Sequence, residues 1–395
     1  MKMEPINYFY VFPQLYAIGE LPTQIWRLRN LLSKIQHAFK LTIITYPLQK
    51  LRINTSLFNI ALRGLNVVHT TDNNLIWFTE DSPYRSICEY QNNVYINLTI
   101  SEISPLFFKE FQNQTPTYHF ELSRFEKKIG EQLRLKYNIP NGAPIITLHV
   151  REAGYKETHG TREGSDGRLR NASIESYIPT IEYLTNEGYY VVRLGDNTMK
   201  SLPHFDKFID TTQESHQLIE PYFISESKFY IGLASGPLTI ADAFGTPRLC
   251  TNYPLWNHVY AWKKDLFIFK KYYSKILKRF LTYEEIICSE VVNFSNYDQA
   301  LQNDIEVVEN TPEEILLSAK EMIARLDNNY ISLDNMRRLN KYFINIQKKA
   351  IKKFNDLVYR PIHYFFDETK VPISLEYIRL NSSNFNLFYN VSGTE

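Results

Sequence analysis

The stretch Ile231–Leu249, which reads IGLASGPLTIADAFGTPRL, contains the signals that decide the fold. A short apolar run leads into the small-residue turn at Ser235 and Gly236, and the turn leads into a helical pattern that ends at Gly245. A second apolar run begins directly after Pro247. A strand, a tight turn, a short helix and another strand are the parts of a β-α-β unit, so this stretch predicts a parallel sheet.

The same alternation continues on both sides of this stretch. In the second half, strand-sized apolar runs occur at residues 145–150, 189–195, 228–233 and 247–252. In the first half, similar runs occur at residues 8–12, 41–46 and 66–70. Strands that alternate with helical patterns indicate parallel sheets covered on both faces. We therefore expect two Rossmann-like α/β domains, at 1–139 and 140–325, followed by a mostly helical segment at 326–395.

Length and composition agree with a two-domain α/β protein of a reducing compartment. A chain of 395 residues exceeds what one hydrophobic core usually supports. Its 44 basic and 43 acidic residues nearly cancel, which argues against nucleic acid as the main partner. Cys88, Cys250 and Cys288 are too few and too widely spaced for a disulfide framework or a metal pair. We expect neither a signal peptide nor a membrane span.

The turn at Ser235 and Gly236 is the first candidate binding element. It precedes Pro237, Leu238 and Thr239, which begin the expected helix. Backbone N–H groups at a helix N-terminus, with the hydroxyls of Ser235 and Thr239 as additional donors, suit a diphosphate without a metal ion. The alternative is a purely structural β-α turn, in which glycine avoids a clash and serine caps the helix.

The run IGLASGPLTIADAFGTPRL resembles the donor-site segment of GT-B glycosyltransferases, in particular the heptosyltransferase type. More broadly, residues 140 to 290 resemble bacterial glycosyltransferases associated with surface-polysaccharide synthesis. The resemblance implies a GT-B fold, with two Rossmann-like domains facing each other across a cleft. It also implies a nucleotide-sugar donor in the second domain and a glycan or lipid-linked acceptor at the first. The expected reaction is inverting glycosyl transfer in the cytoplasm, although no motif specifies the stereochemistry.

The strand at 145–150 delivers His149 and Arg151 to the edge where open α/β sheets bind ligands. This H-x-R pattern also resembles the first motif of fucosyltransferases, whose arginine meets the nucleotide diphosphate. A guanidinium can bind two phosphate oxygens and neutralise the charge of a leaving group. The alternatives are a surface salt bridge between Arg151 and Glu152, and a hydrogen-bonded core position for His149.

Further candidates follow in the next loop and after the next strand. The loop at 152–172 contains Arg162, Arg168 and Arg170, of which Arg170 lies next to the following helix. Arg193, Gly195 and Asp196 end the next strand at the same expected edge. The glycine would permit close approach of a nucleotide, whereas the aspartate has the alternative role of closing a turn.

Glu20 is the candidate catalytic base, because it follows the first strand and opens a helix. The heptosyltransferase type has Gly-Asp in this loop, and Gly19-Glu20 matches it in position and charge. A carboxylate placed there can take the proton of the acceptor hydroxyl. The alternative for Glu20 is a favourable interaction with the helix dipole, and Glu152 is the second candidate for the base.

No D-x-D pair, Gly-rich nucleotide motif or metal-spaced cluster occurs in the sequence, so we expect metal-independent transfer without a cofactor. Two rival functions remain: a nucleotide-sugar epimerase of the same fold, and a non-catalytic glycan- or nucleotide-binding module. Basic and aromatic residues alternate at 262–280 and again at 342–353. They suggest peripheral contact with the inner face of the cell membrane, or else ordinary solvated faces.

Overall fold

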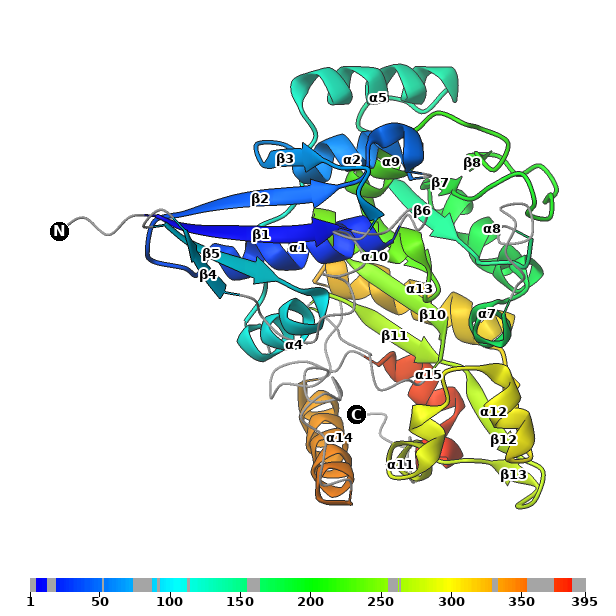
Figure 1. Cartoon of the computed structure of the whole chain (residues 1–395). Coiled ribbons are helices and arrows are strands. Elements are labelled where there is room, and N and C mark those ends of the chain that lie inside the picture. Colours follow the sequence, from blue (N-terminus) through cyan, green and yellow to red (C-terminus); the bar gives the residue numbers. More distant parts are fainter. Residues whose placement is uncertain are drawn as a thin grey trace. The chain divides into compact units, whose positions relative to one another are not determined.

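The computed structural model describes residues 5–12, 19–51, 53–73, 87–90, 93–111, 114–154, 164–254, 262, 264–328, 333–353 and 373–385. The chain forms two compact units, whose elements are labelled in Figure 1. Unit 1 comprises Met1–Gly130, His216–Ser225 and Thr239–Gly245. Unit 2 comprises Glu131–Ser215, Glu226–Leu238 and Thr246–Glu395. Because the units interleave in sequence, the domain boundary at 139/140 stays a prediction.

The sheet of unit 1 has the strand order β3-β2-β1-β5-β4. Its central strand β1 pairs in parallel with β2 and β5, and only β4 is antiparallel. The strands are β1 (Ile6–Phe12), β2 (Phe39–Thr45), β3 (Asn66–His69), β4 (Ile87–Tyr90) and β5 (Asn93–Leu98). The chain therefore places β2 and β5 on opposite sides of β1, which opens a crevice at the carboxyl ends of β1 and β5.

Helix α1 (Glu20–Leu32) follows β1 and is amphipathic. Leu21, Ile25, Leu28 and Leu32 recur at helical spacing and are all buried. The other helices of this unit that follow the first strands are α2 (Thr55–Leu62) and α4 (Ile100–Glu110). A capping box of Thr99 and Glu102 begins α4 at the end of β5.

The larger sheet, in unit 2, is parallel throughout and has the order β11-β10-β9-β6-β7-β8. Its strands are β6 (Ile145–His149), β7 (Tyr190–Arg193), β8 (Phe208–Asp210), β9 (Ser227–Gly232), β10 (Arg248–Tyr253) and β11 (Leu266–Phe269). Every residue of β6 and β10 is buried. That burial explains the apolar run of β6, whereas β10 also buries the polar side chains of Arg248, Thr251 and Asn252.

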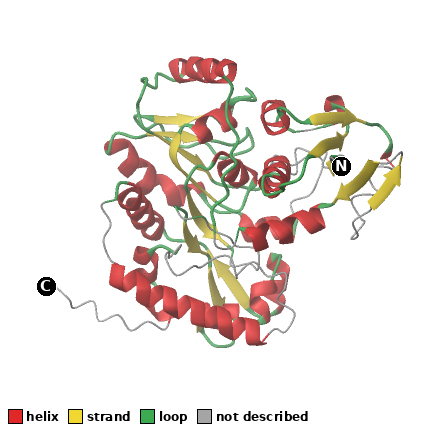
Figure 2. Cartoon of the chain, turned by 90° about the vertical axis from the view of Figure 1, so that its left-hand side faces the viewer, coloured by secondary structure: helices red, strands yellow, loops and turns green. Residues whose placement is uncertain are grey.

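Helices alternate with the strands of this sheet along the chain; Figure 2 colours helices red and strands yellow. They are α5 (Arg124–Lys136), α7 (Ser165–Arg170), α8 (Ile178–Asn186), α9 (Ile219–Ser225), α10 (Gly236–Phe244) and α13 (Pro312–Leu326). Helix α13 packs against α8 and against β10 and β11. A capping box of Thr311 and Glu314 fixes its start, as the sequence predicts.

A small antiparallel sheet and several helices follow β11. The sheet has the order β13-β12-β14 and consists of β12 (Lys271–Ser274), β13 (Arg279–Phe280) and β14 (Ile305–Val308). The helices are α11 (Tyr283–Ile287), α12 (Tyr297–Gln302), α14 (Leu333–Lys353) and α15 (Leu375–Leu380). The basic stretch at 262–280 thus contains strands, and the described residues after 326 include α14 and α15.

The predicted α/β class is confirmed, since both units contain a parallel sheet connected by helices. One local prediction is wrong: the segment 151–172 is not all loop, because α7 occupies residues 165–170. Arg162, Gly160, Ala17 and Ile18 lie outside the described residues. In the part of the chain that the structure describes, no helix is long and apolar enough to cross a membrane.

Candidate active site

The strand order of unit 2 points to one edge of its sheet. From the central strand β6 the chain proceeds to β7 and β8 on one side, and then returns to β9 on the other side of β6. In open α/β sheets, such a reversal leaves a crevice at the carboxyl ends of the two strands, and ligands bind there. The candidate site therefore lies where β6 and β9 end.

A hydrogen bond joins the ends of these two strands. His149 is the last residue of β6, and its Nδ1 lies 3.1 Å from the hydroxyl oxygen of Ser235, just after β9. The pKa of His149 is lowered to about 4, mainly by burial; Asp196 opposes this shift, and Arg151 and Arg193 contribute to it. The imidazole is therefore neutral at pH 7 and fixed between the two strands. This agrees with the core position that the sequence left open for it.

Helix α10 begins at Gly236, directly after that hydrogen bond. Pro237 and Leu238 are buried in its first turn, and Thr239 donates a hydrogen bond of 2.9 Å to the carbonyl oxygen of Gly19 within unit 1. The helix ends at Gly245, whose φ of 72° is left-handed. A side chain at Gly245 would also come within 2.8 Å of His119, so both backbone and space require glycine there.

Arg151 binds the segment that follows β6. Its guanidinium donates to the carbonyl oxygen of Gly167 at 3.0 Å and to the side-chain oxygen of Asn171. The backbone N–H of Ala172 donates to the carbonyl oxygen of Arg151 at 3.1 Å. Arg151 is half-buried and holds α7 at the carboxyl end of β6. The sequence also left open a salt bridge between Arg151 and Glu152. In the structure, the carboxylate of Glu152 has other partners.

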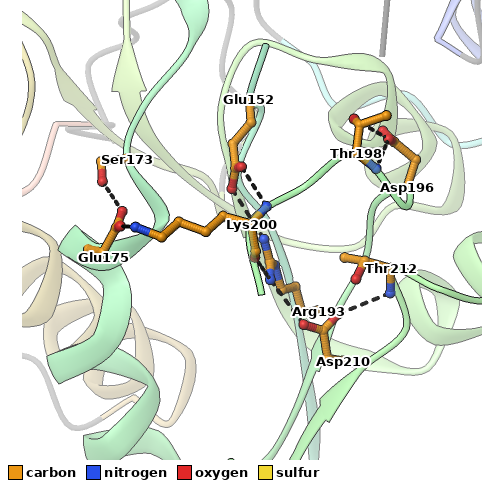
Figure 3. A network of polar contacts seen from close by, with 9 residues as sticks. All are labelled: Glu152, Ser173, Glu175, Arg193, Asp196, Thr198, Lys200, Asp210 and Thr212. Atoms are coloured by element: carbon orange, nitrogen blue, oxygen red, sulfur yellow. Dashed lines mark hydrogen bonds and ion pairs between the residues drawn. The ribbon is translucent and has the colours of Figure 1, made fainter. Parts of the chain in front are cut away.

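Glu152 instead pairs with Arg193, at the centre of the network in Figure 3. The side chain of Arg193 is 0% exposed, and its guanidinium contacts Glu152 at 3.2 Å and Asp210 at 3.0 Å. It also donates to the carbonyl oxygen of Lys200 at 2.6 Å. Glu152 accepts a second hydrogen bond of 2.9 Å from the backbone N–H of Lys200. These contacts fix the exits of β6, β7 and β8 relative to each other.

Gly195 and Asp196 form a tight turn after β7. Gly195 has a φ of 156°, and a side chain there would meet the sulfur of Met199 at 2.2 Å. The carboxylate of Asp196 accepts from the backbone N–H and the hydroxyl of Thr198 at 2.9 and 2.5 Å. Asp196 therefore closes the turn, which is the alternative role that the sequence gave it.

The remaining arginines have different surroundings. Arg168 is exposed and pairs with Asp298 at 2.6 Å, while its guanidinium lies 5.4 Å from the ring centre of Tyr297. Arg170, at the end of α7, is half-buried and precedes Asn171. Of these two, Arg170 lies nearer in sequence to the segment that Arg151 holds.

In unit 1, Glu20 is the first residue of α1 and is exposed. Its carboxylate accepts a hydrogen bond of 3.1 Å from the side-chain amide of Gln24. Gln24 is buried, and its oxygen accepts from the hydroxyl of Tyr10 on β1. The chain of hydrogen bonds orients Glu20 from within the sheet. Gly19, the preceding residue, accepts from Thr239 of α10.

Sequence reasoning missed two residues at this edge of unit 2, Asn171 and Lys270. Lys270 directly follows β11 and is 4% exposed, although the basic stretch around it suggested a solvated or lipid-facing position. Its ammonium donates to the carbonyl oxygen of Asn171 at 2.5 Å. The apolar run Leu266–Phe269 directly before it was the signal that could have indicated a buried strand end.

No group of three or more His, Cys, Asp or Glu side chains that could hold a metal ion occurs among the described residues. No family model matches the chain, and no curated protein matches it in sequence.

Several solved structures resemble the chain, and they are glycosyltransferases. A family 9 glycosyl transferase from Veillonella parvula shares 12% identity, with 63% of this chain and 81% of that chain covered and a TM-score of 0.39. The E. coli ADP-heptose lipopolysaccharide heptosyltransferase II shares 12% identity, with coverages of 62% and 84% and a TM-score of 0.36. E. coli heptosyltransferase WaaC with ADP shares 9% identity, with coverages of 62% and 87% and a TM-score of 0.34.

The resemblance to heptosyltransferase-type proteins, first stated from the sequence, thus recurs among solved structures at the level of the fold. TM-scores below 0.5 assign no activity to this chain, so its function has to be argued from its own residues.

Proposed function

We propose that the chain is a glycosyltransferase that binds a nucleotide-sugar donor at the carboxyl edge of the unit 2 sheet. The observation that carries this proposal is the reversal of strand order between β6 and β9, where His149 and Ser235 meet at 3.1 Å. Two candidate phosphate-binding elements, Arg151 and the start of α10, follow directly from these two strand ends. This arrangement supports a nucleotide site better than a site for an uncharged glycan alone.

The donor diphosphate would lie between Arg151 and the first turn of α10. The positive end of the helix dipole and the guanidinium both stabilise the negative charge that develops as the nucleoside diphosphate leaves. The neutral imidazole of His149 fixes Ser235 on this turn, whereas the hydroxyl of Thr239 already donates to the carbonyl oxygen of Gly19. Because these groups would take the place of a metal cation beside the diphosphate, we propose that transfer proceeds without a metal ion.

Arg193 receives a different role in this proposal. Its guanidinium is held by Glu152, Asp210 and a backbone carbonyl, so in this proposal it acts as a positioning residue and not as a direct phosphate ligand. Gly195 and Asp196 shape the turn beside it. Arg170 remains a proposed donor-binding residue through its position at the end of α7.

For the catalytic base we propose Glu20. Its carboxylate is exposed and accepts from Gln24, whereas the carboxylate of Glu152 is occupied by Arg193 and by the backbone of Lys200. A base must accept a proton from the acceptor hydroxyl, and a carboxylate in a buried ion pair is poorly suited to that task. Direct displacement with Glu20 as the base would invert the configuration of the transferred sugar.

The acceptor is proposed to be a glycan or lipid-linked sugar of surface-polysaccharide synthesis, with the protein at the inner face of the cell membrane. Support comes from the turn between β12 and β13, where Ile276 and Leu277 are 72% and 52% exposed. Lys275 and Lys278 flank them and are exposed as well. Apolar side chains between lysines suit an anionic lipid surface.

A thermal-shift panel of nucleoside diphosphates tests the donor site, because a ligand that binds only the folded state raises the melting temperature. Sugar nucleotides with the preferred base are then incubated with and without lipid-linked acceptors. Transfer to an acceptor supports the proposal. Conversion of the donor alone would identify an epimerase, and binding without turnover would identify a binding module. A chain that binds no nucleoside diphosphate would refute the proposed donor site.

A further inference from the structure

Lys270 is a buried cation of unit 2 that has no carboxylate partner among the described residues. It follows the last residue of β11, is 4% exposed, and donates from its ammonium to one acceptor, the carbonyl oxygen of Asn171 at 2.5 Å. Within the described part of the chain, no ion pair involves this ammonium. Burial of an ammonium without a carboxylate partner is costly, because a single carbonyl oxygen replaces only part of its hydration.

Three other buried cations of this unit have carboxylate partners, whereas the buried Arg134 donates to the backbone carbonyl oxygens of Pro140 and Ala143. Lys271, the next residue, pairs with Glu314 at 2.7 Å. Arg248 pairs with Asp265 at 2.5 Å, and Arg193 pairs with two carboxylates. The nearest acidic influence on Lys270 is Glu309, whose carboxylate accepts from the backbone of Ser173 instead. Burial consequently lowers the pKa of Lys270 to about 8.

The position of Lys270 connects it to the candidate donor site. The backbone carbonyl oxygen of Asn171 accepts a hydrogen bond from the ammonium of Lys270, and its side-chain oxygen accepts one from the guanidinium of Arg151. Two cations, one following β6 and one following β11, thus contact the same uncharged residue. An anion bound beside Asn171 would be within reach of both cations and would supply the charge that Lys270 lacks.

We propose that Lys270 and Arg151 together form an anion subsite at Asn171, and that this subsite binds a phosphate group of the ligand. In the setting of the proposed function, on which this identification of the ligand rests, the phosphate belongs to the nucleoside diphosphate of the donor. The competing explanation is structural: Lys270 would only tie the segment after α7 to the end of β11 through the carbonyl of Asn171. The two explanations differ in what removal of the charge does.

The test compares Lys270→Met, Lys270→Arg and the control Lys128→Met, which removes an exposed lysine of α5. Melting temperatures and dissociation constants are measured with sulfate, with nucleoside diphosphates and with the corresponding nucleosides. We expect Lys270→Met to weaken the binding of sulfate and nucleoside diphosphate by about 10- to 100-fold and to leave nucleoside binding unchanged. Lys270→Arg should retain most of the anion affinity, and Lys128→Met should behave like the wild type.

The melting temperature of the ligand-free protein separates ligand binding from a structural tie. Loss of an uncompensated buried charge should leave that temperature unchanged or raise it. A lower melting temperature with unchanged anion affinity would show that Lys270 is structural, and would overturn the proposal. If Lys270→Met and the wild type bound a nucleoside diphosphate equally tightly, the proposal would also be overturned, while the proposed function would remain intact. Sulfate binding that depends on Lys270, without any nucleoside diphosphate binding, would support the subsite and refute the proposed function. Wild-type protein that binds neither anion would refute both.

If Lys270→Met does not fold, the wild type still decides the question through its pH dependence. The charged groups that face Lys270 are Glu309 and, through Asn171, Arg151. Sulfate itself keeps its charge between pH 7 and 9. Its affinity should therefore fall as the ammonium of Lys270 loses its proton, and an affinity that is constant from pH 7 to 9 would overturn the proposal.

Discussion

Acidification should destabilise the protein through His149, which is buried and linked to Ser235 at the centre of the candidate site. Its pKa falls from 6.5 to about 4 in the folded chain, a difference of about 2.5 units. Between these two values the unfolded chain binds the proton and the folded chain does not, so stability decreases as the pH falls from 6.5 towards 4. At about 1.4 kcal/mol per unit, the loss amounts to about 3 kcal/mol and is absent above pH 7.

The assay is urea unfolding of the wild type and of His149→Gln at intervals from pH 7.5 to 4.5. Glutamine can still bond with Ser235 but cannot take up a proton, so this variant reports the loss of stability due to all other groups. The difference between the two free energies of unfolding should change by about 2 kcal/mol or more in favour of the variant as the pH falls. Parallel curves for the two proteins would refute the assignment of a buried neutral imidazole.

Four further outcomes follow from the proposed site. Arg151→Ala should weaken nucleoside diphosphate binding by about 2 to 3 kcal/mol but spare the nucleoside, as calorimetry with both ligands would show; equal losses would remove Arg151 from the phosphate site. Turnover should persist in EDTA, and activity that disappears and returns with magnesium or manganese would contradict metal-independent transfer. Glu20→Gln should lower turnover by roughly 100-fold with unchanged donor affinity, whereas near-normal turnover would pass the role of base to Glu152. Replacing Ile276 and Leu277 by serine should reduce co-sedimentation with vesicles that contain phosphatidylglycerol, and unchanged sedimentation would exclude this turn as a membrane contact.

Much of the fold could be predicted because its determinants are local. Apolar runs marked the strands of the large sheet, and Gly245 marked the end of α10 by its need for a positive φ. The order of the strands could not be predicted, since nothing local shows that β6 lies at the centre and that β9 pairs beside it. The position of the candidate site depends on that order, and it became visible only in the three-dimensional arrangement.

Side-chain partners were the least predictable feature. Arg151 and Glu152 are adjacent in sequence, which suggested a pair, yet each contacts a different segment. Residues that leave a strand in succession point in different directions, so adjacency in the chain does not bring their side chains together. Asp210 and Lys200, which complete the Arg193 network, lie 17 and 7 residues further along the chain. No spacing rule connects them.

The roles of two cations at this edge depend on how many acidic groups surround each of them. Arg193 has two carboxylates and is thereby restricted to positioning, whereas Lys270 has one carbonyl oxygen. A cation whose charge is balanced inside the protein has little left to offer a ligand, because binding would first have to break the internal pair. A cation that is only partly solvated by the protein gains most from an anion. Of these two cations, Lys270 should accordingly contribute more to the affinity of this edge for phosphate, although Arg193 is the more deeply buried.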